Sequence, residues 1–488
     1  MNMKNIIAIF QNHYQKIILV FCFFISVFII FTDLHTAPLE NWDEAFYGAT
    51  VKELIQRKDP IVLYFNGSPF LEKPPLQMWL VSLTTKFTGL NEFAIRFPSA
   101  VSAIVIIALI LFYAYKYYGL IPALVAFCTL VCSDLFIWRA RTGNLDALTM
   151  LLVLLIFIFI SSKNKFRYII LGLLFGLLYL TKLGMMYFPL IIFIAHELIY
   201  KHKDFQKNVF EYLKLFCLVL LIPGIWLFLG YREVGIEFIN NFLLKSDQGA
   251  LRLSSQTFRV DYLFYTYYAL QRYYLWILFV GLIYALWNIK NNRNFLLICF
   301  STLLIFQLSF IERKNNWYIL PSLPFWSLTL AYGISEVLKF FKRKNSVLYI
   351  FFGISICLFI TVYSYKRWNV NIKPILSSMT SIKEVTSAKI IKNTTSSNTN
   401  IVRLDHLYPS TIYYSERHTY ISVSDVEMNG GSYVNKQNLI QLVAKDQVQV
   451  LVGKSDEVDR VLAMIPGRTY KRVNSTDESI IYLDKVER

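Results

Sequence analysis

The chain has 488 residues, of which 56% are hydrophobic and 17% are charged, and it carries 49 Lys and Arg against 32 Asp and Glu. This is more apolar surface than a soluble core of this length needs, which excludes an ordinary water-soluble enzyme and predicts a chain dissolved in a lipid bilayer. We attribute the net charge of +17 to basic loops that set the membrane topology and to attraction to anionic membrane lipids. We therefore expect no nucleic-acid partner.

Long apolar runs recur along the chain, and a helix of about 20 residues crosses the ~30 Å hydrocarbon layer of a bilayer. The strands of a membrane barrel would give short alternating runs instead. We therefore predict a polytopic α-helical membrane protein with about 11, and up to 13, transmembrane helices. The predicted spans lie near 17–32, 98–115, 119–133, 147–161, 168–181, 184–199, 213–230, 273–288, 295–311, 317–337 and 346–364.

The orientation follows from the Lys and Arg residues, which gather in alternate loops such as 163–167, 201–207 and 339–344. Loops rich in Lys and Arg face the cytoplasm. We therefore expect a multi-pass protein of the inner (cytoplasmic) membrane with a cytoplasmic N-terminus. The long loops 33–97 and 231–272 then lie outside the cytoplasm, within a transmembrane domain that covers residues 1–369.

The composition becomes polar after residue 369, with short β-rich runs at 419–423 and 448–452. This pattern predicts a soluble extracytoplasmic α/β domain over 370–488.

The cysteines lie in or beside apolar runs, where a thiol behaves as a small hydrophobe. No disulfide framework is therefore expected.

Two adjacent carboxylates, Asp43 and Glu44, follow the first span at the start of the first exterior loop. A carboxylate in a partly desolvated pocket has a raised pKa and can act as a general base toward a hydroxyl acceptor. The same residues could instead favour the positive end of a helix that runs through 51–54. From the residue types alone, both interpretations stay open.

The sequence Glu72-Lys73-Pro74-Pro75 follows in the same loop. Two prolines restrict the backbone beside the charged pair and so fix where both side chains point. A rigidly presented lysine suits phosphate binding. The alternative is a solvated loop whose ion pair contributes little to stability.

The order of these motifs resembles the family 39 type of C-class (GT-C) glycosyltransferases, the group of protein O-mannosyltransferases and bacterial aminoarabinose–lipid A transferases. The resemblance covers most of residues 30–340. It rests on Asp43-Glu44-Ala45-x-Tyr47, Asn66-Gly67-x-Pro69, Glu72-Lys73-Pro74-Pro75-Leu76, Asn91-Glu92-Phe93-Ala94-x-Arg96-x-Pro98-Ser99-Ala100, residues 141–146, Thr181-Lys182 and Tyr318-x-Leu320-Pro321-x-Leu323-Pro324.

The resemblance implies transfer of a sugar from a polyprenyl-phosphate donor to a lipid, glycan or protein acceptor at the outer face of the membrane, usually with inversion. It implies that Asp43 is the catalytic base and Asp146 a second acidic site residue, with Glu44 a further catalytic candidate. Lys73, Arg252 and Tyr318 are similar in position to the family's ligands of the carrier phosphate. Lipid A modification, other cell-envelope glycosylation and protein O-mannosylation all fit.

The sequence departs from the aminoarabinose branch at Asp247, where that branch tends to place a histidine metal ligand. Glu72 and Asp247 could still hold a hard divalent ion through oxygen ligands, whereas a zinc site built on imidazole becomes doubtful. Lys182 could bind substrate or reach the membrane interface. Arg141, like Arg139, could contact substrate phosphate or anchor the chain at lipid headgroups.

The main alternative is a secondary transporter of a small polar or lipid-linked solute. A transporter would be expected to carry ionisable residues and Gly or Pro breaks near the middle of its spans. The interiors of the spans near 104–112 and 151–160 are uncharged, and the candidate polar residues concentrate in exterior loops. A plain membrane anchor would leave so many spans and the Glu-Lys-Pro-Pro loop unexplained.

Overall fold

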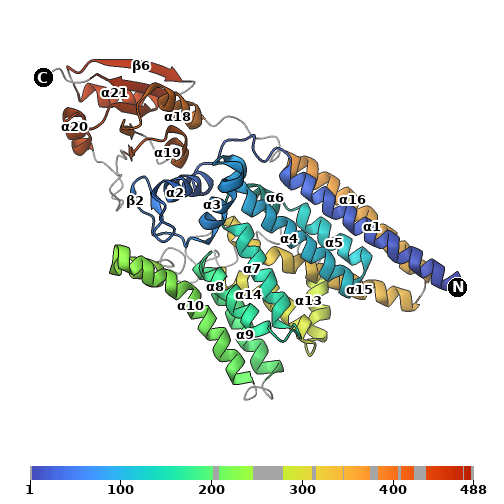
Figure 1. The fold of residues 1–488 in the computed structure, drawn as a ribbon. Helices are drawn as coiled ribbons and strands as arrows, with labels where there is room; N and C mark the ends of the chain where they lie inside the picture. Colours follow the sequence, from blue (N-terminus) through green and yellow to red (C-terminus); the bar gives the residue numbers. More distant parts are fainter. Residues whose placement is uncertain are drawn as a thin grey trace. The chain divides into compact units, whose positions relative to one another are not determined.

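The computed structural model describes residues 3–201, 208–245, 278–309, 315–344, 346–373, 383–404, 408–421, 436–465, 467–475 and 478–484. Helices dominate these residues, and a small sheet lies near the C-terminus (Figure 1). The predicted site residues Asp247 and Arg252 lie outside the described residues.

Each predicted span overlaps a helix of the structure. These helices are α1 (Met3–Phe31), α4 (Glu92–Tyr118), α5 (Leu120–Val131), α7 (Asp146–Ile160), α8 (Arg167–Tyr179), α9 (Tyr187–Tyr200), α10 (Val209–Val234), α13 (Leu278–Trp287), α14 (Asn292–Ser309), α15 (Leu323–Lys344) and α16 (Ser346–Arg367). Within the described ranges, five helical segments are long and apolar enough to cross a membrane, and six if α5 is joined to α6 (Asp134–Arg141) across a 65° bend. The predicted polytopic helical fold is confirmed.

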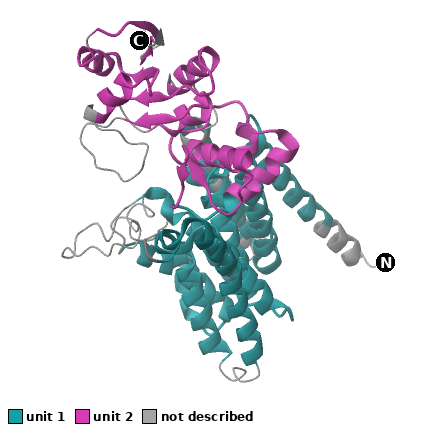
Figure 2. Ribbon diagram, turned by 60° about the vertical axis from the view of Figure 1, so that its left-hand side comes forward, with its two compact units in different colours: residues 1–34, 72–77, 96–378 teal, residues 35–71, 78–95, 379–488 magenta. Residues whose placement is uncertain are grey.

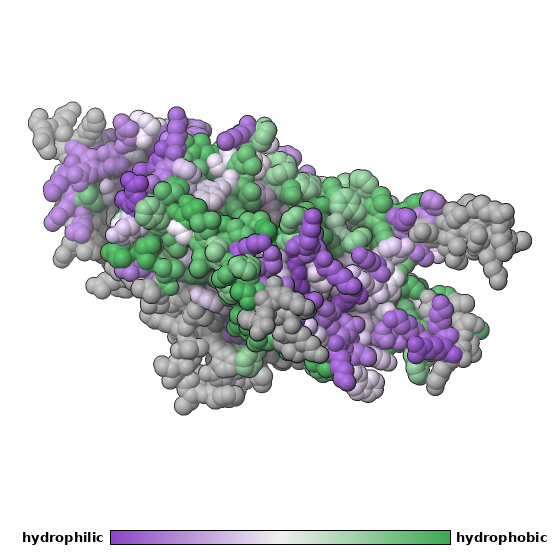
Figure 3. Space-filling model, turned by 60° about the horizontal axis from the view of Figure 1, so that its bottom comes forward, coloured by the Kyte–Doolittle hydropathy of each residue, from purple (hydrophilic) through white to green (hydrophobic). Residues whose placement is uncertain are grey.

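Large apolar side chains are exposed along several of these helices. Phe28 on α1, Phe210 on α10 and Val362 on α16 are 71%, 76% and 67% exposed. Figure 3 shows hydrophobic surface over much of one face, interrupted by hydrophilic areas. Exposed apolar area on this scale is unfavourable in water and suits contact with lipid tails.

Two glycines allow α8 and α10 to pack closely. Gly172 and Gly176 are four residues apart and therefore share one face of α8. A Cβ atom at Gly172 would lie 2.9 Å from the Leu215 carbonyl oxygen, and one at Gly176 would lie 2.8 Å from Ile222. Small residues at this spacing are typical of close helix contacts in membranes.

A buried polar cluster joins α8, α9 and α10. The Arg167 guanidinium lies 2.6 Å from a Glu197 oxygen, and both side chains are 7% exposed. Tyr168 and Tyr212 each donate a hydrogen bond of 2.8 Å to the other Glu197 oxygen. His196 Nδ1 lies 3.1 Å from the carboxylate. Arg167, which the sequence interpretation counts as a loop charge that sets topology, is therefore also a buried partner of Glu197.

By their contacts the residues divide into two compact units, which are coloured separately in Figure 2. The first comprises residues 1–34, 72–77 and 96–378, and the second comprises 35–71, 78–95 and 379–488. The predicted C-terminal domain thus shares its unit with residues 35–71 and 78–95, two parts of the loop that the sequence predicts to be exterior.

The second unit contains a five-stranded sheet with strand order β4-β3-β5-β7-β6. The strands are β3 (Ile401–Arg403), β4 (Thr419–Ile421), β5 (Val450–Gly453), β6 (Tyr470–Ser475) and β7 (Glu478–Leu483). Strand β3 is parallel to β4 and β5, and β7 is antiparallel to β5 and β6. The C-terminal part of this unit also contains the helices α18 (Lys383–Thr394), α19 (Pro409–Ser415), α20 (Lys436–Ala444) and α21 (Ser455–Ala463). The predicted α/β fold is confirmed.

The same unit contains α2 (Asp43–Arg57) and a hairpin of β1 (Tyr64–Phe65) and β2 (Ser68–Pro69). Asn66 and Gly67 form the two-residue turn with φ angles of 52° and 84°. Positive φ at both positions defines a type I′ turn, for which Asn-Gly is the preferred sequence. The Asn66 amide donates to the Thr419 carbonyl oxygen (2.7 Å) and accepts from the Thr419 N–H (3.0 Å), so the hairpin is fixed to β4.

Candidate functional site

A polar site in the first unit is built on the turn between α6 and α7. The Asn144 side chain donates to the Thr142 hydroxyl (2.5 Å) and accepts from the Asp146 N–H (2.8 Å). The Ser99 hydroxyl on α4 donates to the Asn144 carbonyl oxygen (2.9 Å). Asp146 is thereby held at the first position of α7, where the helix dipole favours a negative charge.

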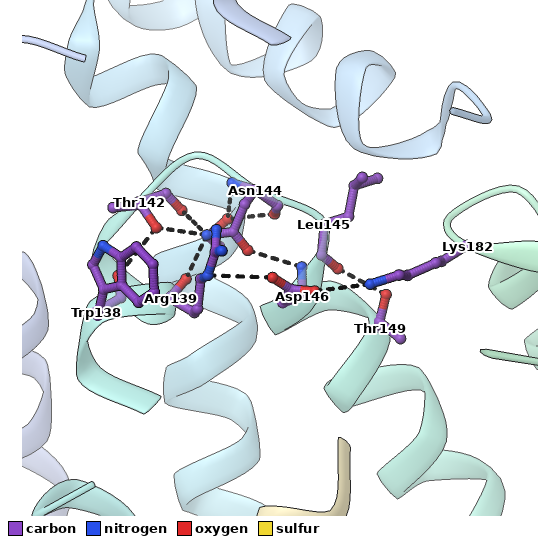
Figure 4. Close-up of polar contacts among 9 residues, drawn as sticks. Trp138, Arg139, Thr142, Asn144, Leu145, Asp146, Thr149 and Lys182 are labelled. Atoms are coloured by element: carbon purple, nitrogen blue, oxygen red, sulfur yellow. Dashed lines mark hydrogen bonds and ion pairs between the residues drawn. The ribbon is translucent and has the colours of Figure 1, made fainter. Parts of the chain in front are cut away.

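The Asp146 carboxylate lies between two cations (Figure 4). Its Oδ2 is 3.4 Å from Arg139 Nε, and its Oδ1 is 3.2 Å from Lys182 Nζ. The Asp146 and Arg139 side chains are 8% and 4% exposed, whereas Lys182 is 21% exposed. Two cations thus flank one carboxylate, and Lys182 is the more exposed of the two.

Aromatic rings complete this arrangement. The Arg139 guanidinium lies over the rings of Trp138 (4.1 Å) and Trp317 (4.6 Å). Lys182 Nζ lies 5.0 Å from the ring centre of Tyr318. Trp317 and Tyr318 belong to the 3₁₀ helix η7 (Asn316–Ser322). The structure therefore brings together three predicted site residues, Asp146, Lys182 and Tyr318.

The Glu-Lys-Pro-Pro loop is tied to the same turn and to the segment before Lys182. The Leu76 N–H at the start of α3 (Leu76–Thr88) donates to the Leu180 carbonyl oxygen (3.0 Å). Gln77 donates to the Ser99 hydroxyl (3.3 Å), which in turn donates to the Asn144 carbonyl oxygen. These hydrogen bonds fix the end of the loop that presents Lys73, and they join motifs that are distant in the sequence.

Lys73 is half-buried and Glu72 is exposed, while Pro74 and Pro75 are buried. Burial of both prolines supports the prediction that this loop is rigid.

Within the described ranges, no group of three or more His, Cys, Asp or Glu side chains could hold a metal ion. The described residues therefore supply one predicted metal ligand, Glu72, and do not by themselves form a site that fits the ion.

Arg141 anchors α6 to the end of α1. Its Nη1 donates to the carbonyl oxygens of Ile29 (2.8 Å), Ile30 (3.0 Å) and Thr32 (2.8 Å). A cation is favourable at a helix C-terminus, where carbonyl groups lack intrahelical partners. The predicted contact of Arg141 with substrate stays a prediction beside this observed structural contact.

In the second unit, Asp43 and Glu44 occupy the first turn of α2. Glu44 is 2% exposed and accepts a hydrogen bond from the Glu40 N–H (2.7 Å). Asp43 is half-buried. Both carboxylates therefore lie at the positive end of the α2 dipole, as the second interpretation predicts.

Farther along α2, Lys52 pairs with Glu416 at 2.6 Å. Burial lowers the pKa of Lys52 below its ordinary value, although the hydrogen bond to Glu416 opposes this shift. The pKa of Glu416 is also below its ordinary value: burial raises it, but hydrogen bonds from Lys392 and Lys52 outweigh that effect.

From the sequence, Arg139 is expected to contact substrate phosphate or lipid headgroups, and no role is assigned to Asn144. The signal for Asn144 was its place between Thr142 and Asp146, because an Asn two residues before a helix start commonly accepts a backbone hydrogen bond. The pairing of Arg139 with Asp146 depends on how the chain turns between α6 and α7, which residue periodicity does not reveal.

The family described as dolichyl-phosphate-mannose-protein mannosyltransferase matches residues 72–226. This segment contains Lys73, Arg141, Asp146 and Lys182. The predicted resemblance is therefore confirmed over residues 72–226.

Two proteins of Aquifex aeolicus (strain VF5), both described as uncharacterized, are each 25% identical to this chain. The alignments cover 68% and 70% of this chain and 67% and 77% of theirs.

Solved structures show the same fold. ArnT from Cupriavidus metallidurans bound to undecaprenyl phosphate matches with a TM-score of 0.73 and 15% identity, over 98% of each chain. The oligosaccharyltransferase of Archaeoglobus fulgidus matches in its apo form with a TM-score of 0.61 and 12% identity, over 98% of this chain and 75% of that one. A complex of the same enzyme with zinc and sulfate matches with a TM-score of 0.54. These likenesses confirm the GT-C type of fold.

Proposed function

We propose that this chain is a membrane-embedded glycosyltransferase that moves a sugar from a polyprenyl-phosphate donor to a lipid, glycan or protein acceptor. The observation that carries the proposal is the joining of the Glu-Lys-Pro-Pro loop, the Asp146 turn and the Lys182 segment within the part of the chain that matches the mannosyltransferase family. The likeness to a protein that binds undecaprenyl phosphate supports the choice of donor.

In the proposed reaction, the acceptor hydroxyl oxygen attacks the anomeric carbon of the sugar while Asp43 takes its proton. The bond between that carbon and the phosphate oxygen breaks, and the polyprenyl phosphate leaves with the electron pair and one additional negative charge. Attack from the side opposite the leaving group inverts the anomeric carbon. No step of this reaction is assigned to a metal ion.

Cations held in place beforehand stabilise such a leaving group more than the donor itself, which lowers the barrier. We assign this role to Lys73 and Arg252, with Tyr318 as a hydrogen-bonding partner of the phosphate. Lys182, the more exposed of the two cations beside Asp146, would add positive charge near the phosphate. Arg252 and the metal ligand Asp247 stay predictions from the sequence motifs.

The proposed location is the inner (cytoplasmic) membrane, with the reaction at its outer face and the α/β domain outside the cytoplasm. The support is the distribution of Lys and Arg among the loops.

The experiment uses the purified chain in nanodiscs with polyprenyl-phosphate-linked sugars and extracts of envelope lipids, glycans and proteins as acceptors. We expect release of polyprenyl phosphate that depends on an acceptor. Asp43→Asn keeps the shape of the side chain but cannot take the proton, so transfer should fall about a hundredfold or more, as expected for a general base.

Asp59→Asn is the matched control, because Asp59 lies in the same unit and its oxygen accepts from the Ile61 and Val62 N–H groups, as an asparagine oxygen also would. It should keep parental transfer. Accumulation of a solute in sealed vesicles without sugar transfer would favour the transporter alternative. Parental transfer by Asp43→Asn would remove Asp43 as the base.

A further inference from the structure

The turn that leads into α2 has an unusual backbone. Trp42, the residue before Asp43, has φ of 70° and is 59% exposed. A non-glycine residue pays a steric penalty in this region, and such a conformation persists only where surrounding contacts enforce it. The contacts of this turn therefore matter for where Asp43 points.

Helix α19 of the C-terminal segment makes these contacts. The buried Tyr414 hydroxyl accepts from the Leu39 N–H (2.8 Å) and donates to Glu92 (2.8 Å). The Ser410 hydroxyl donates to the Asn41 side-chain oxygen (2.5 Å), and the Ser410 N–H donates to the same oxygen (3.3 Å). Two residues of α19 thus fix Leu39 and Asn41, which lie three residues and one residue before Trp42.

Packing holds α19 against α2 as well. A Cβ atom at Gly48 would lie 3.3 Å from the Tyr413 ring, so the glycine allows the two helices to approach closely. Lys52 of α2 donates to the Tyr413 carbonyl oxygen (3.2 Å) and pairs with Glu416 just after α19. The hydrogen bonds to the turn therefore come from a helix that is itself fixed along α2.

We infer that α19 is a positioning element for the proposed base, with Ser410 and Tyr414 as positioning residues that hold the turn before Asp43. The C-terminal domain would then take part in sugar transfer through this helix, without contact between these two residues and the reacting atoms. The inference rests on the proposed function, because it needs Asp43 to be the base. A general base must be held close to its productive geometry, so a loose turn lowers the rate of the chemical step.

The test compares Tyr414→Phe and Ser410→Ala with Tyr482→Phe and Ser455→Ala. The control residues lie in the same domain and lose a hydrogen bond to Thr394 and Ser479, respectively, without touching the turn. We expect faster amide hydrogen exchange over residues 38–50 in the α19 variants alone. Their kcat should fall about tenfold, because a loosened turn holds Asp43 in its productive geometry for less of the time, with donor KM unchanged.

Two substitutions of Asn41, the turn residue that accepts from Ser410, distinguish a positioning effect from a general loss of folding. Asn41→Asp keeps an oxygen that can accept from Ser410, whereas Asn41→Ala does not, so only Asn41→Ala should show faster exchange and a lower kcat. Parental exchange or parental kcat in the α19 variants, together with an inactive Asp43→Asn, would overturn the positioning role and leave the proposed function standing. Parental transfer by Asp43→Asn would instead overturn both the base and this inference.

Discussion

Asp146 and Arg139 form a pair whose members are almost inaccessible to water. Asp146→Asn removes the negative charge and leaves the Arg139 guanidinium buried with less compensation. Loss of one partner of a buried pair costs about 3–5 kcal/mol. We expect a lower thermal midpoint and lower transfer, measured by scanning calorimetry in nanodiscs and by the sugar-transfer assay.

Asp456→Asn provides the control, because its pair with Arg460 is exposed and contributes little. A parental midpoint for Asp146→Asn would contradict the role given to the pair.

Lys73 lies in a loop that is fixed at its end through Leu76 and Gln77. Lys73→Ala should lower transfer roughly ten- to hundredfold, because a hydrogen bond to a charged group contributes about 1.5–3 kcal/mol. Arg252→Ala should act in the same direction.

Kinetics against donor concentration measure this effect, and Lys86→Ala, an exposed lysine on α3, serves as the control. If Lys73→Ala and Lys86→Ala had equal rates, Lys73 would not bind the carrier phosphate.

Glu197 connects α8, α9 and α10 through its contacts with four side chains, those of Arg167, Tyr168, His196 and Tyr212. Glu197→Gln leaves Arg167 buried without a carboxylate, so we expect a loss of roughly 3–5 kcal/mol in stability. Denaturation in detergent measures the loss.

Glu211→Gln breaks an exposed pair with Lys214 and should change the midpoint little. Equal midpoints for the two variants would show that the cluster does not hold these helices together.

His418 gives the second unit a dependence on pH. Burial lowers the pKa of His418 below its ordinary value of 6.5, although Glu53 and a backbone hydrogen bond at Asn66 act against this shift. The unfolded chain then binds more protons than the folded chain below about pH 6.5, so stability is present above this pH and is lost as the pH falls.

Thermal midpoints between about pH 7.5 and pH 5.5 should therefore fall, and His418→Gln should reduce that fall. His35→Gln, a change of an exposed histidine in the same unit, should keep the parental dependence. An unchanged dependence in His418→Gln would assign the effect to other groups.

The helices could be predicted well because runs of apolar residues determine them directly. The β1–β2 hairpin was missed, although Asn66-Gly67 is a strong hairpin signal, because its strands are only two residues long. The docking of α19 on the Asn41 turn joins residues 369 positions apart. A single sequence contains no periodicity from which such a contact can be derived.

The positions of the basic loops predict which parts of the chain face each side of the membrane. A reporter enzyme fused after Arg488 should be active only outside the cytoplasm, and one fused after Lys203 only inside. Paired reporters that work in opposite compartments measure this. Activity of the Arg488 fusion inside the cytoplasm would reverse the orientation and move the proposed reaction to the other face.

Asn66 has a further consequence for the sheet of the second unit. Among the described strands, β4 lies at one edge of the sheet, and the backbone of an edge strand can pair with a strand of another chain. The Asn66 amide occupies both the N–H and the carbonyl oxygen of Thr419, as the peptide group of an added strand would. At the other edge, β6 carries Lys471 and Arg472, charges that oppose strand addition. Self-association through this sheet is thereby disfavoured in a protein confined at high local density to a membrane surface.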